Sequence, residues 1–346
     1  MKKIKEILGN HPNDGSVFSK WLDCEIDNSR DNPHRKLSEI LLNDEIISQI
    51  AEWIKQHHIS EKQTKLTEQK KEILRKYGLD EFVNSQNFFP DNDNTKKGNL
   101  GEIILCEYLE TTSDYEILVY RLRYNPNVSQ SMKGDDIVLF NKDDLREAII
   151  LGEAKYRIPA TKSTIEEILT SFGGEPKLPL SLTFLSNILR DNGNDDIADE
   201  IEVIQMELRK GNIPTFNIGF IVGDDNTHKS VDNHHLLGDF KITQDTINEL
   251  KNENDFPSDE LLPFMNITFK TETALYERLN RTLKKKKLPE LTAKNKEKLF
   301  EFTQKKNNPN LAFITLSSAN ADKLLDSYIK AEELLKQEFE NELRKS

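Results

Sequence analysis

Cysteine is scarce in this chain. Its 346 residues include only Cys24 and Cys106, and Cys106 lies within an apolar helical pattern, so a disulfide framework is not expected. Long hydrophobic runs are also missing: none approaches the about 18 residues of a transmembrane helix. The beginning, MKKIKEILGN, lacks the apolar core of a signal peptide. We therefore expect a cytoplasmic protein with no membrane partner.

Positive charge is in the minority, with 48 basic against 60 acidic residues and a formal net charge of −12. This balance seems to argue against nucleic acid as a partner, but net charge is a poor guide to a local binding surface. From Leu118 to Lys162 the chain carries eight basic and six acidic residues, so this segment is locally basic. The segment therefore permits a nucleic-acid site within an acidic chain.

Apolar periodicity divides the chain into three regions. Residues 1–90 predict helices, including LSEILLNDEIISQIAEWIKQ, and form a candidate partner-binding region. Residues 91–260 predict the core, which follows a loop or domain junction at residues 86–98. Residues 261–346 predict a C-terminal extension that either completes the core or docks a partner, and it ends in a polar helix.

The core region alternates between helical and strand patterns. An apolar helix, NLGEIILCEYLE, precedes three predicted strands, YEILVYRLR, KGDDIVLF and AIILGEAKYR. A helix from KSTIEEILTSF, two more helices and the strand IPTFNIGFIVG follow, and a further strand is expected at LAFITLS. The predicted fold class is α/β.

The second and third predicted strands carry the residues of most chemical interest. Residues i and i+2 of a strand share a face, so Glu153 and Lys155 project side by side. An acid of the preceding strand, Asp136 or Asp135, can face Glu153 across the ladder. Two carboxylates suit a hard cation that keeps several waters, and a lysine can stabilise charge on a phosphate or orient the attacking water. This constellation is typical of a phosphodiesterase that uses Mg²⁺, with Mn²⁺ as an alternative.

Glu102 strengthens this hypothesis. On a helical wheel it falls among apolar neighbours, where a carboxylate needs a partner or a metal. Lys133 is the preferred phosphate contact, with Arg157 and Lys162 as further candidates for binding nucleic acid. The ordinary alternative for an isolated Glu-x-Lys pair is a surface salt bridge, and solvated charge is the alternative for the basic residues.

Two other patterns are rejected. The segment from Gly223 to Ser230 has the spacing of an ATP-binding loop, but His228 replaces its second glycine and two aspartates would repel phosphates. A zinc site at His228, Asp232, His234 and His235 is also not expected, because adjacent histidines in a polar loop are more often solvated.

The order of helix with Glu102, three strands and helix resembles the PD-(D/E)XK nuclease superfamily, and GNLGEIILCEYL, SMKGDDIVLF and LGEAKYR are similar to the HamA family. The resemblance implies a restriction-endonuclease-like αβββαβ core with a central mixed sheet, plus helical N-terminal and C-terminal extensions. By the same resemblance Asp136, Glu153 and Lys155 are catalytic, with Glu102 as a helix-borne metal ligand beside Asp136 and Glu153. It implies Mg²⁺ as cofactor, no small-molecule cofactor, DNA as substrate and a superfamily 2 helicase (HamB-like) as partner.

The leading hypothesis is therefore a magnesium-dependent DNA endonuclease with little sequence specificity, acting as the effector of an antiphage defence system under helicase control. The alternatives are a stand-alone restriction or repair nuclease of the same superfamily, a DNA-binding subunit without catalysis, or an interaction adaptor.

Overall fold

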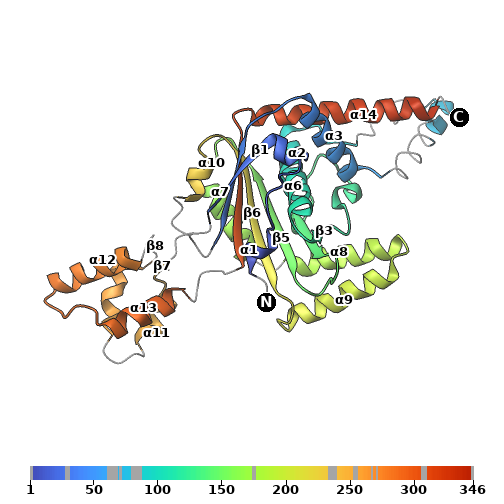
Figure 1. Ribbon diagram of the computed structural model, residues 1–346. Helices are drawn as coiled ribbons and strands as arrows, with labels where there is room; N and C mark the ends of the chain where they lie inside the picture. Colours follow the sequence, from blue (N-terminus) through green and yellow to red (C-terminus); the bar gives the residue numbers. More distant parts are fainter. Residues whose placement is uncertain are drawn as a thin grey trace.

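The structure is a computed structural model. It describes residues 3–27, 32–60, 69, 72–78, 88–173, 177–232, 240–251, 256–265, 268–269, 272–304 and 310–343. A mixed sheet of seven strands forms its centre, with helices on both faces (Figure 1). The strands lie in the order β1-β2-β9-β6-β5-β4-β3. Their bounds are Leu22–Asp27 (β1), His34–Glu39 (β2), Leu311–Ser317 (β9), Thr215–Gly223 (β6), Ile149–Tyr156 (β5), Ile137–Asn141 (β4) and Tyr115–Glu116 (β3).

The middle of this sheet is parallel and its two edges are antiparallel. Strands β2, β9, β6 and β5 pair in parallel, whereas β1 pairs with β2, and β3 and β4 continue from β5, in antiparallel fashion. The order α6-β3-β4-β5-α7-β6, with α6 at Asp93–Thr112 and α7 at Lys162–Gly173, is the αβββαβ order. The predicted α/β fold with a restriction-endonuclease-like core and a central mixed sheet is confirmed.

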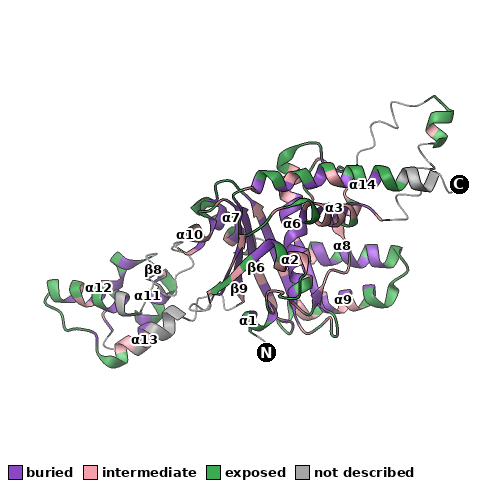
Figure 2. Cartoon of the chain, turned by 45° about the horizontal axis from the view of Figure 1, so that its top comes forward, coloured by how far each residue is buried: buried purple, intermediate pink, exposed green. Residues whose placement is uncertain are grey.

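Alternation along β5 separates the two faces of the sheet. Ile150 and Ala154 belong to the core beneath α6, while Ile149 belongs to the cluster beneath α8 (Leu178–Asp191) and α9 (Asp195–Arg209). Figure 2 shows the strands almost wholly buried between these layers. Because side chains alternate in a strand, Glu153 and Lys155 lie on the same face as Ile149, toward α7 and α8.

Terminal helices complete the α6 layer. Helix α3 (Asp44–His58) packs against α14 (Asp326–Leu343), and both contribute buried side chains to the same core as α6. Short helices accompany them at Ile4–Ile7 (α1), Val17–Trp21 (α2) and Thr227–Asp232 (α10), with 3-10 turns at Arg121–Tyr124 (η1), Ser258–Phe264 (η3) and Ala321–Leu325 (η4).

A small helical lobe lies beside the sheet (Figure 1). It comprises η3 and the elements β7 (Phe240–Lys241), α11 (Gln244–Lys251), β8 (Thr268–Phe269), α12 (Glu272–Lys285) and α13 (Ala293–Gln304). Its buried apolar side chains form a cluster separate from those around the sheet, with Ile247, Leu261 and Leu279 fully buried in it. The lobe therefore has its own hydrophobic core.

The helical expectation for residues 1–90 is wrong at β1 and β2. Leu37 lies in β2, and Ile40 and Leu41, expected on the same helix, are exposed after it. The local pattern failed here because the neighbour of β2 is β9, about 275 residues further along the chain. The sheet thus takes strands from all three predicted regions, while the division into domains itself stays a prediction.

Two further boundaries differ from expectation. The predicted strand YEILVYRLR is a strand only at Tyr115–Glu116, because β4 offers Asn141 and Phe140 as partners and the chain then leaves the sheet for η1. Residues 93–98, expected in a loop, form the first turns of α6, where the Asn92 side chain caps the helix by accepting from the Thr95 amide.

The segment rejected as a zinc site takes part in a buried polar network. His34 of β2 lies 2.8 Å from both the Asp232 carboxylate and the Thr315 hydroxyl, and His228 lies 2.7 Å from the same hydroxyl. These contacts join α10 to β2 and β9. His234 and His235 lie outside the described residues.

Among the helices that the structure describes, none has the length and apolar character needed to cross a lipid bilayer.

Candidate active site

The β4–β5 hairpin brings the predicted catalytic residues to one end of the sheet. Its register pairs Ile137 with Gly152, so Asp136, the next residue outward, comes opposite Glu153. The Asp136 carboxylate accepts a hydrogen bond from the Ala154 amide at 2.9 Å, which fixes it at the end of β4. Opposed residues of an antiparallel pair share a face, so the two acids point to the same side.

Glu153 is buried and carries a dense set of polar contacts. Its Oε1 lies 2.7 Å from Lys155 Nζ, and its Oε2 accepts from the Ser171 hydroxyl at 2.6 Å and lies 3.3 Å from Lys177 Nζ. Burial acts to raise the pKa of Glu153, but the bonds from Lys155 and Ser171 outweigh it and the pKa lies below its usual value. Glu153 is therefore ionised at neutral pH.

Lys155 shows the complementary shift. Burial acts to lower the pKa of its ammonium group, but the hydrogen bond and the charge of Glu153 prevail, and the pKa is raised. For Asp136 the pKa is raised, by burial first and then by the negative charge of Glu153. These opposite shifts show three charged groups interacting at the end of two adjacent strands.

Glu102 reaches the same region from α6, on the other face of the sheet, and Arg121 lies between it and Asp136. The Arg121 guanidinium donates to Glu102 Oε2 at 2.9 and 3.3 Å and to the Asp135 carbonyl at 2.7 Å, and it lies 3.5 Å from Asp136. Burial raises the pKa of Glu102 to about 8, against the opposing effect of Arg121. Arg121 thus neutralises the acidic end of the sheet.

The two adjacent aspartates have different surroundings. Asp135 accepts a 2.8 Å hydrogen bond from the Ser181 hydroxyl of α8, and its own amide donates back to that hydroxyl at 3.0 Å. Asp136, by contrast, faces Glu153. Between the two candidates left open by the sequence, this arrangement favours Asp136 as the acid that acts with Glu153.

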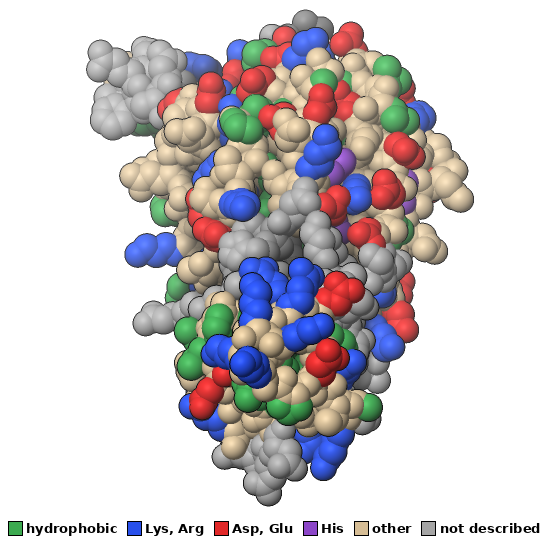
Figure 3. Space-filling view, turned by 90° about the vertical axis from the view of Figure 1, so that its left-hand side faces the viewer, with side chains coloured by type: hydrophobic (Ala, Val, Ile, Leu, Met, Phe, Trp, Pro, Cys, Tyr) green, Lys and Arg blue, Asp and Glu red, His purple; other side chains and the backbone are tan. Residues whose placement is uncertain are grey.

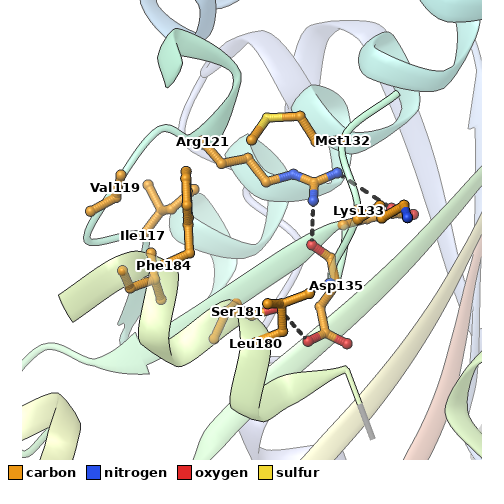
Figure 4. Close-up of a pocket in the computed structure, with 12 residues that line it drawn as sticks. Ile117, Val119, Arg121, Met132, Lys133, Asp135, Leu180, Ser181 and Phe184 are labelled. Atoms are coloured by element: carbon orange, nitrogen blue, oxygen red, sulfur yellow. Dashed lines mark hydrogen bonds and ion pairs between the residues drawn. The ribbon is translucent and has the colours of Figure 1, made fainter. Parts of the chain in front are cut away.

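A cavity of about 170 Å³ opens beside these aspartates. Figure 4 shows Arg121 and Ser181 reaching Asp135 from opposite sides of it. The wall is mostly apolar, and the polar groups gather along one edge. The lining comprises Ile117, Val119, Met132, Val138, Leu180, Phe184 and Leu185, with Arg121, Lys133, Asp135, Asp136 and Ser181 as the polar members.

The predicted phosphate contacts fall at different places around the site. Lys133 lines the cavity, next to the two aspartates. Arg157, just past the end of β5, is half exposed and lies 3.6 Å from Glu167, and Lys162 is exposed at the beginning of α7. Only Lys133 therefore lines the same cavity as Asp136.

The donor set can be compared with what magnesium requires. In the part of the chain that the structure describes, no three His, Cys, Asp or Glu side chains are arranged to hold a metal ion together. Two carboxylates with several waters suffice for Mg²⁺, however, and Asp136 and Glu153 supply such a pair of oxygen donors. Glu102 is engaged by Arg121, so its role as a third ligand stays a prediction.

The sequence did not single out several residues that surround Glu153. Ser171 and Lys177 contact its carboxylate, and Ser181 bonds Asp135. Ser171 stands among other hydroxyl residues of α7, and Lys177 precedes α8 with no motif around it. Arg121 appeared only as a candidate phosphate contact, although its place in a locally basic segment was a usable signal.

Fold and site together define a restriction-endonuclease-like α/β protein with an acid-and-lysine cluster at the ends of β4 and β5. A sequence model of the HamA family matches residues 15–345. The Hachiman protein HamA of Bacillus cereus is 39% identical over 231 residues, which cover 66% of this chain and 83% of that protein. The chain belongs to the HamA family.

Proposed function

We propose that this protein is a metal-dependent deoxyribonuclease that acts as the effector of a Hachiman antiphage defence system. The observation that carries the proposal is the meeting of Asp136, Glu153 and Lys155 at one end of two adjacent strands. An isolated Glu-x-Lys pair would be an ordinary salt bridge, but a buried glutamate opposite a second acid, beside a cavity, is a functional arrangement.

Asp136 and Glu153 are the residues that would hold Mg²⁺, or Mn²⁺ in its place. Such an ion, when bound, supplies Lewis-acid polarisation of a phosphoryl oxygen and lowers the pKa of a bound water. Ser171 orients Glu153 by donating to Oε2, and the Ala154 amide orients Asp136. Glu102 would join them only after exchanging its bond to Arg121.

Lys155 has an electrostatic role in this proposal. Its raised pKa keeps the ammonium group protonated at neutral pH, so it does not act as a general base. A protonated lysine at this position can stabilise the charge that develops on the phosphate during in-line attack, and it can orient the attacking water. By likeness to the superfamily, the products would carry a 3′-hydroxyl and a 5′-phosphate.

The cavity beside Asp136 offers space for the sugar or base next to the scissile phosphate. Its apolar walls present few groups that could distinguish one base from another, while Lys133 and Arg121 stand at the polar edge. Contacts to the DNA backbone set position without reading sequence. We therefore expect cleavage with little sequence preference.

A partner subunit is part of the proposal, because the relative in Bacillus cereus is named for the Hachiman system. The expected partner is a superfamily 2 helicase of the HamB type that restrains the nuclease until infection is sensed. Co-expression with the helicase encoded by a neighbouring gene, followed by co-purification, tests this part directly.

The activity is tested with the wild type and a Glu153→Ala/Lys155→Ala variant, each alone and with the co-expressed helicase. Supercoiled plasmid is incubated with Mg²⁺, Mn²⁺ or EDTA. The matched control is Arg146→Ala/Glu200→Ala, which removes a surface ion pair at the opposite end of the same hairpin. We expect nicking by the wild type and the control, dependent on the metal, and none by the site variant.

Equal cleavage by wild type and site variant would refute the proposal. A protein that binds DNA in every condition and cleaves in none would instead be the non-catalytic subunit considered above. A nuclease that is fully active and regulated without any helicase would be the stand-alone enzyme.

A further inference from the structure

The helical lobe formed by residues 240–304 differs in charge from the rest of the chain. Between Glu272 and Gln304 the sequence has nine basic and five acidic residues, a net charge of +4 within a chain of −12. The rest of the chain therefore carries −16. Positive charge is concentrated on α12, α13 and the turn between them.

Figure 3 shows this concentration as a group of Lys and Arg side chains on the face of the molecule that the lobe presents. The run from Lys284 to Lys287 is fully exposed, as are Arg281 and Lys294. Lys286 is engaged by Glu260 at 2.6 Å. Within the described part of the chain, Lys284, Lys285, Lys287 and Lys294 have no acidic partner, so their charge is directed to solvent.

The turn after α12 shows that lysine is retained here against backbone preference. The Leu288 amide donates to the Leu283 carbonyl and the Lys287 amide to the Lys284 carbonyl, which is the Schellman ending of a helix. Lys287 occupies the left-handed position of this turn with a φ of 57°, where glycine fits with less strain. Four adjacent cations also repel one another, and only the interaction with the helix dipole offsets this.

We propose that this lobe is a second DNA-contacting surface, which binds the phosphodiester backbone through Lys284, Lys285, Lys287 and Lys294. The inference rests on the proposed function, since it adds a contact for the same substrate. A polyanion is the partner chemistry that an uncompensated run of lysines fits. A protein partner is less suited, because lysine is depleted at protein interfaces and Leu288, 40% exposed, is the only large apolar side chain exposed on the described part of α12, α13 and their turn.

The lobe would then hold DNA while the cluster at the ends of β4 and β5 performs the reaction. Binding through phosphates is independent of sequence, which agrees with the apolar walls of the cavity at Asp136. It also lets an acidic chain retain a long polyanion, because the positive charge is gathered on one projecting element.

The test is DNA binding by the full-length chain in EDTA, which separates binding from cleavage. A labelled 30-base-pair duplex is titrated by fluorescence anisotropy at several salt concentrations. The variant is Lys284→Gln/Lys285→Gln/Lys287→Gln, which spares the ion-paired Lys286. The matched control is Lys76→Gln/Lys210→Gln/Lys336→Gln, which removes the same charge from exposed positions elsewhere.

We expect the lobe variant to bind about tenfold to hundredfold more weakly at 0.1 M salt and its salt slope to fall by about 2, whereas the control keeps both. Lys287→Gly alone provides a second readout, since it relieves the backbone strain while removing one charge. It should raise thermal stability and weaken DNA binding together.

Equal affinity and equal salt slope in the lobe variant and the control would overturn the proposal. Unchanged DNA binding combined with weaker capture of the helicase would assign the lobe to an acidic protein partner, which also overturns it. Loss of cleavage in the site variant is scored separately with Mg²⁺, so failure of the nuclease assignment does not alter the binding result.

Discussion

Arg121 is the residue whose environment departs most from the sequence prediction. It is almost buried, with 12% of its side chain exposed, and it faces Glu102, Asp136 and the Asp135 carbonyl together. Removing one partner of a buried ion pair leaves the other charge without compensation. Arg121 therefore stabilises the arrangement of acids that the proposed reaction needs.

Arg121→Met tests this role. We expect the free energy of unfolding to fall by about 3 kcal/mol, at the low end for a broken buried pair, because Glu102 can take up a proton. Its pKa is already about 8, since burial disfavours the charged form. Denaturant unfolding measures the change.

Adding Glu102→Gln to Arg121→Met should restore part of this stability, because it removes one uncompensated acid. Glu102→Gln alone should change stability by less than about 1 kcal/mol, since the amide can accept the same hydrogen bonds. A double variant as unstable as Arg121→Met would contradict the account.

His58 gives the chain a dependence on pH. Its ring is buried beside Phe89 and Tyr328, and neither ring nitrogen has a hydrogen-bond partner. Burial lowers the pKa of His58 to about 3. Between about pH 6.5 and pH 3 the unfolded chain therefore binds the proton and the folded chain does not, so stability falls as the pH falls.

His58→Leu should remove this dependence. The expected gain relative to the wild type is about 2 kcal/mol larger at pH 5 than at pH 7, from about 1.4 kcal/mol for each pH unit below 6.5. Thermal and denaturant unfolding at both pH values measure it. The same difference between the two proteins at pH 5 and pH 7 would show that His58 does not titrate as described.

The catalytic candidates were predictable from local sequence because strand geometry is local. The i, i+2 relation placed Glu153 beside Lys155, and the short connection between the strands placed Asp136 opposite. The contacts of Ser171 and Lys177 with Glu153 depend on how α7 and α8 pack on the sheet. No local spacing carries that information.

At the scale of elements, Gly152 determines how closely α6 lies on β5. A Cβ at this position would come 2.9 Å from Leu105 Cδ2 and 3.1 Å from Ile137 Cβ. The leucine end can move, but Ile137 Cβ is fixed by its strand. The close approach keeps Glu102 near the ends of β4 and β5.

Gly152→Ala should therefore destabilise the fold by about 1–3 kcal/mol, the usual cost of overpacking. It should also lower DNA cleavage, because α6 carries Glu102. The control is Gly98→Ala, in the same helix, where an added Cβ meets nothing within 4 Å. That change should be neutral or stabilise the helix by up to about 1 kcal/mol. Equal stability of the two variants would exclude the packing explanation.

Elements with long apolar runs were predictable, and polar ones were not. Strands β5, β6 and β9 are apolar over most of their length and were expected. Strands β1 and β2 read LDCEID and HRKLSE, where charged residues obscure the alternation. Pairing with the interior strand β9 supplies what their composition lacks, and such pairing is not visible in a local window.

For the whole molecule, the position of β9 explains why the lobe can be separate. Strand β9 enters the middle of the sheet, between β2 and β6, directly after the lobe. Asp232 binds the His34 ring, and the Phe313 amide donates to the Pro33 carbonyl, so the chain leaves and re-enters the sheet near the same place. The lobe therefore resembles an insertion between α10 and β9.

Replacing residues 233–309 with an eight-residue Gly/Ser linker tests this arrangement. Such a linker spans about 16 Å on average, and three strand residues separate residue 310 from Phe313, or about 10 Å. We expect cooperative unfolding with a midpoint within a few degrees of the wild type, because the lobe has its own core. DNA binding in EDTA should weaken at least as much as in the triple lysine variant. Deleting residues 310–343 instead should abolish folding, since all seven residues of β9 are buried in the sheet interior. If the linker variant also fails to unfold cooperatively, the lobe and the sheet form one folding unit, and the loss of DNA binding in that variant would reflect loss of the fold.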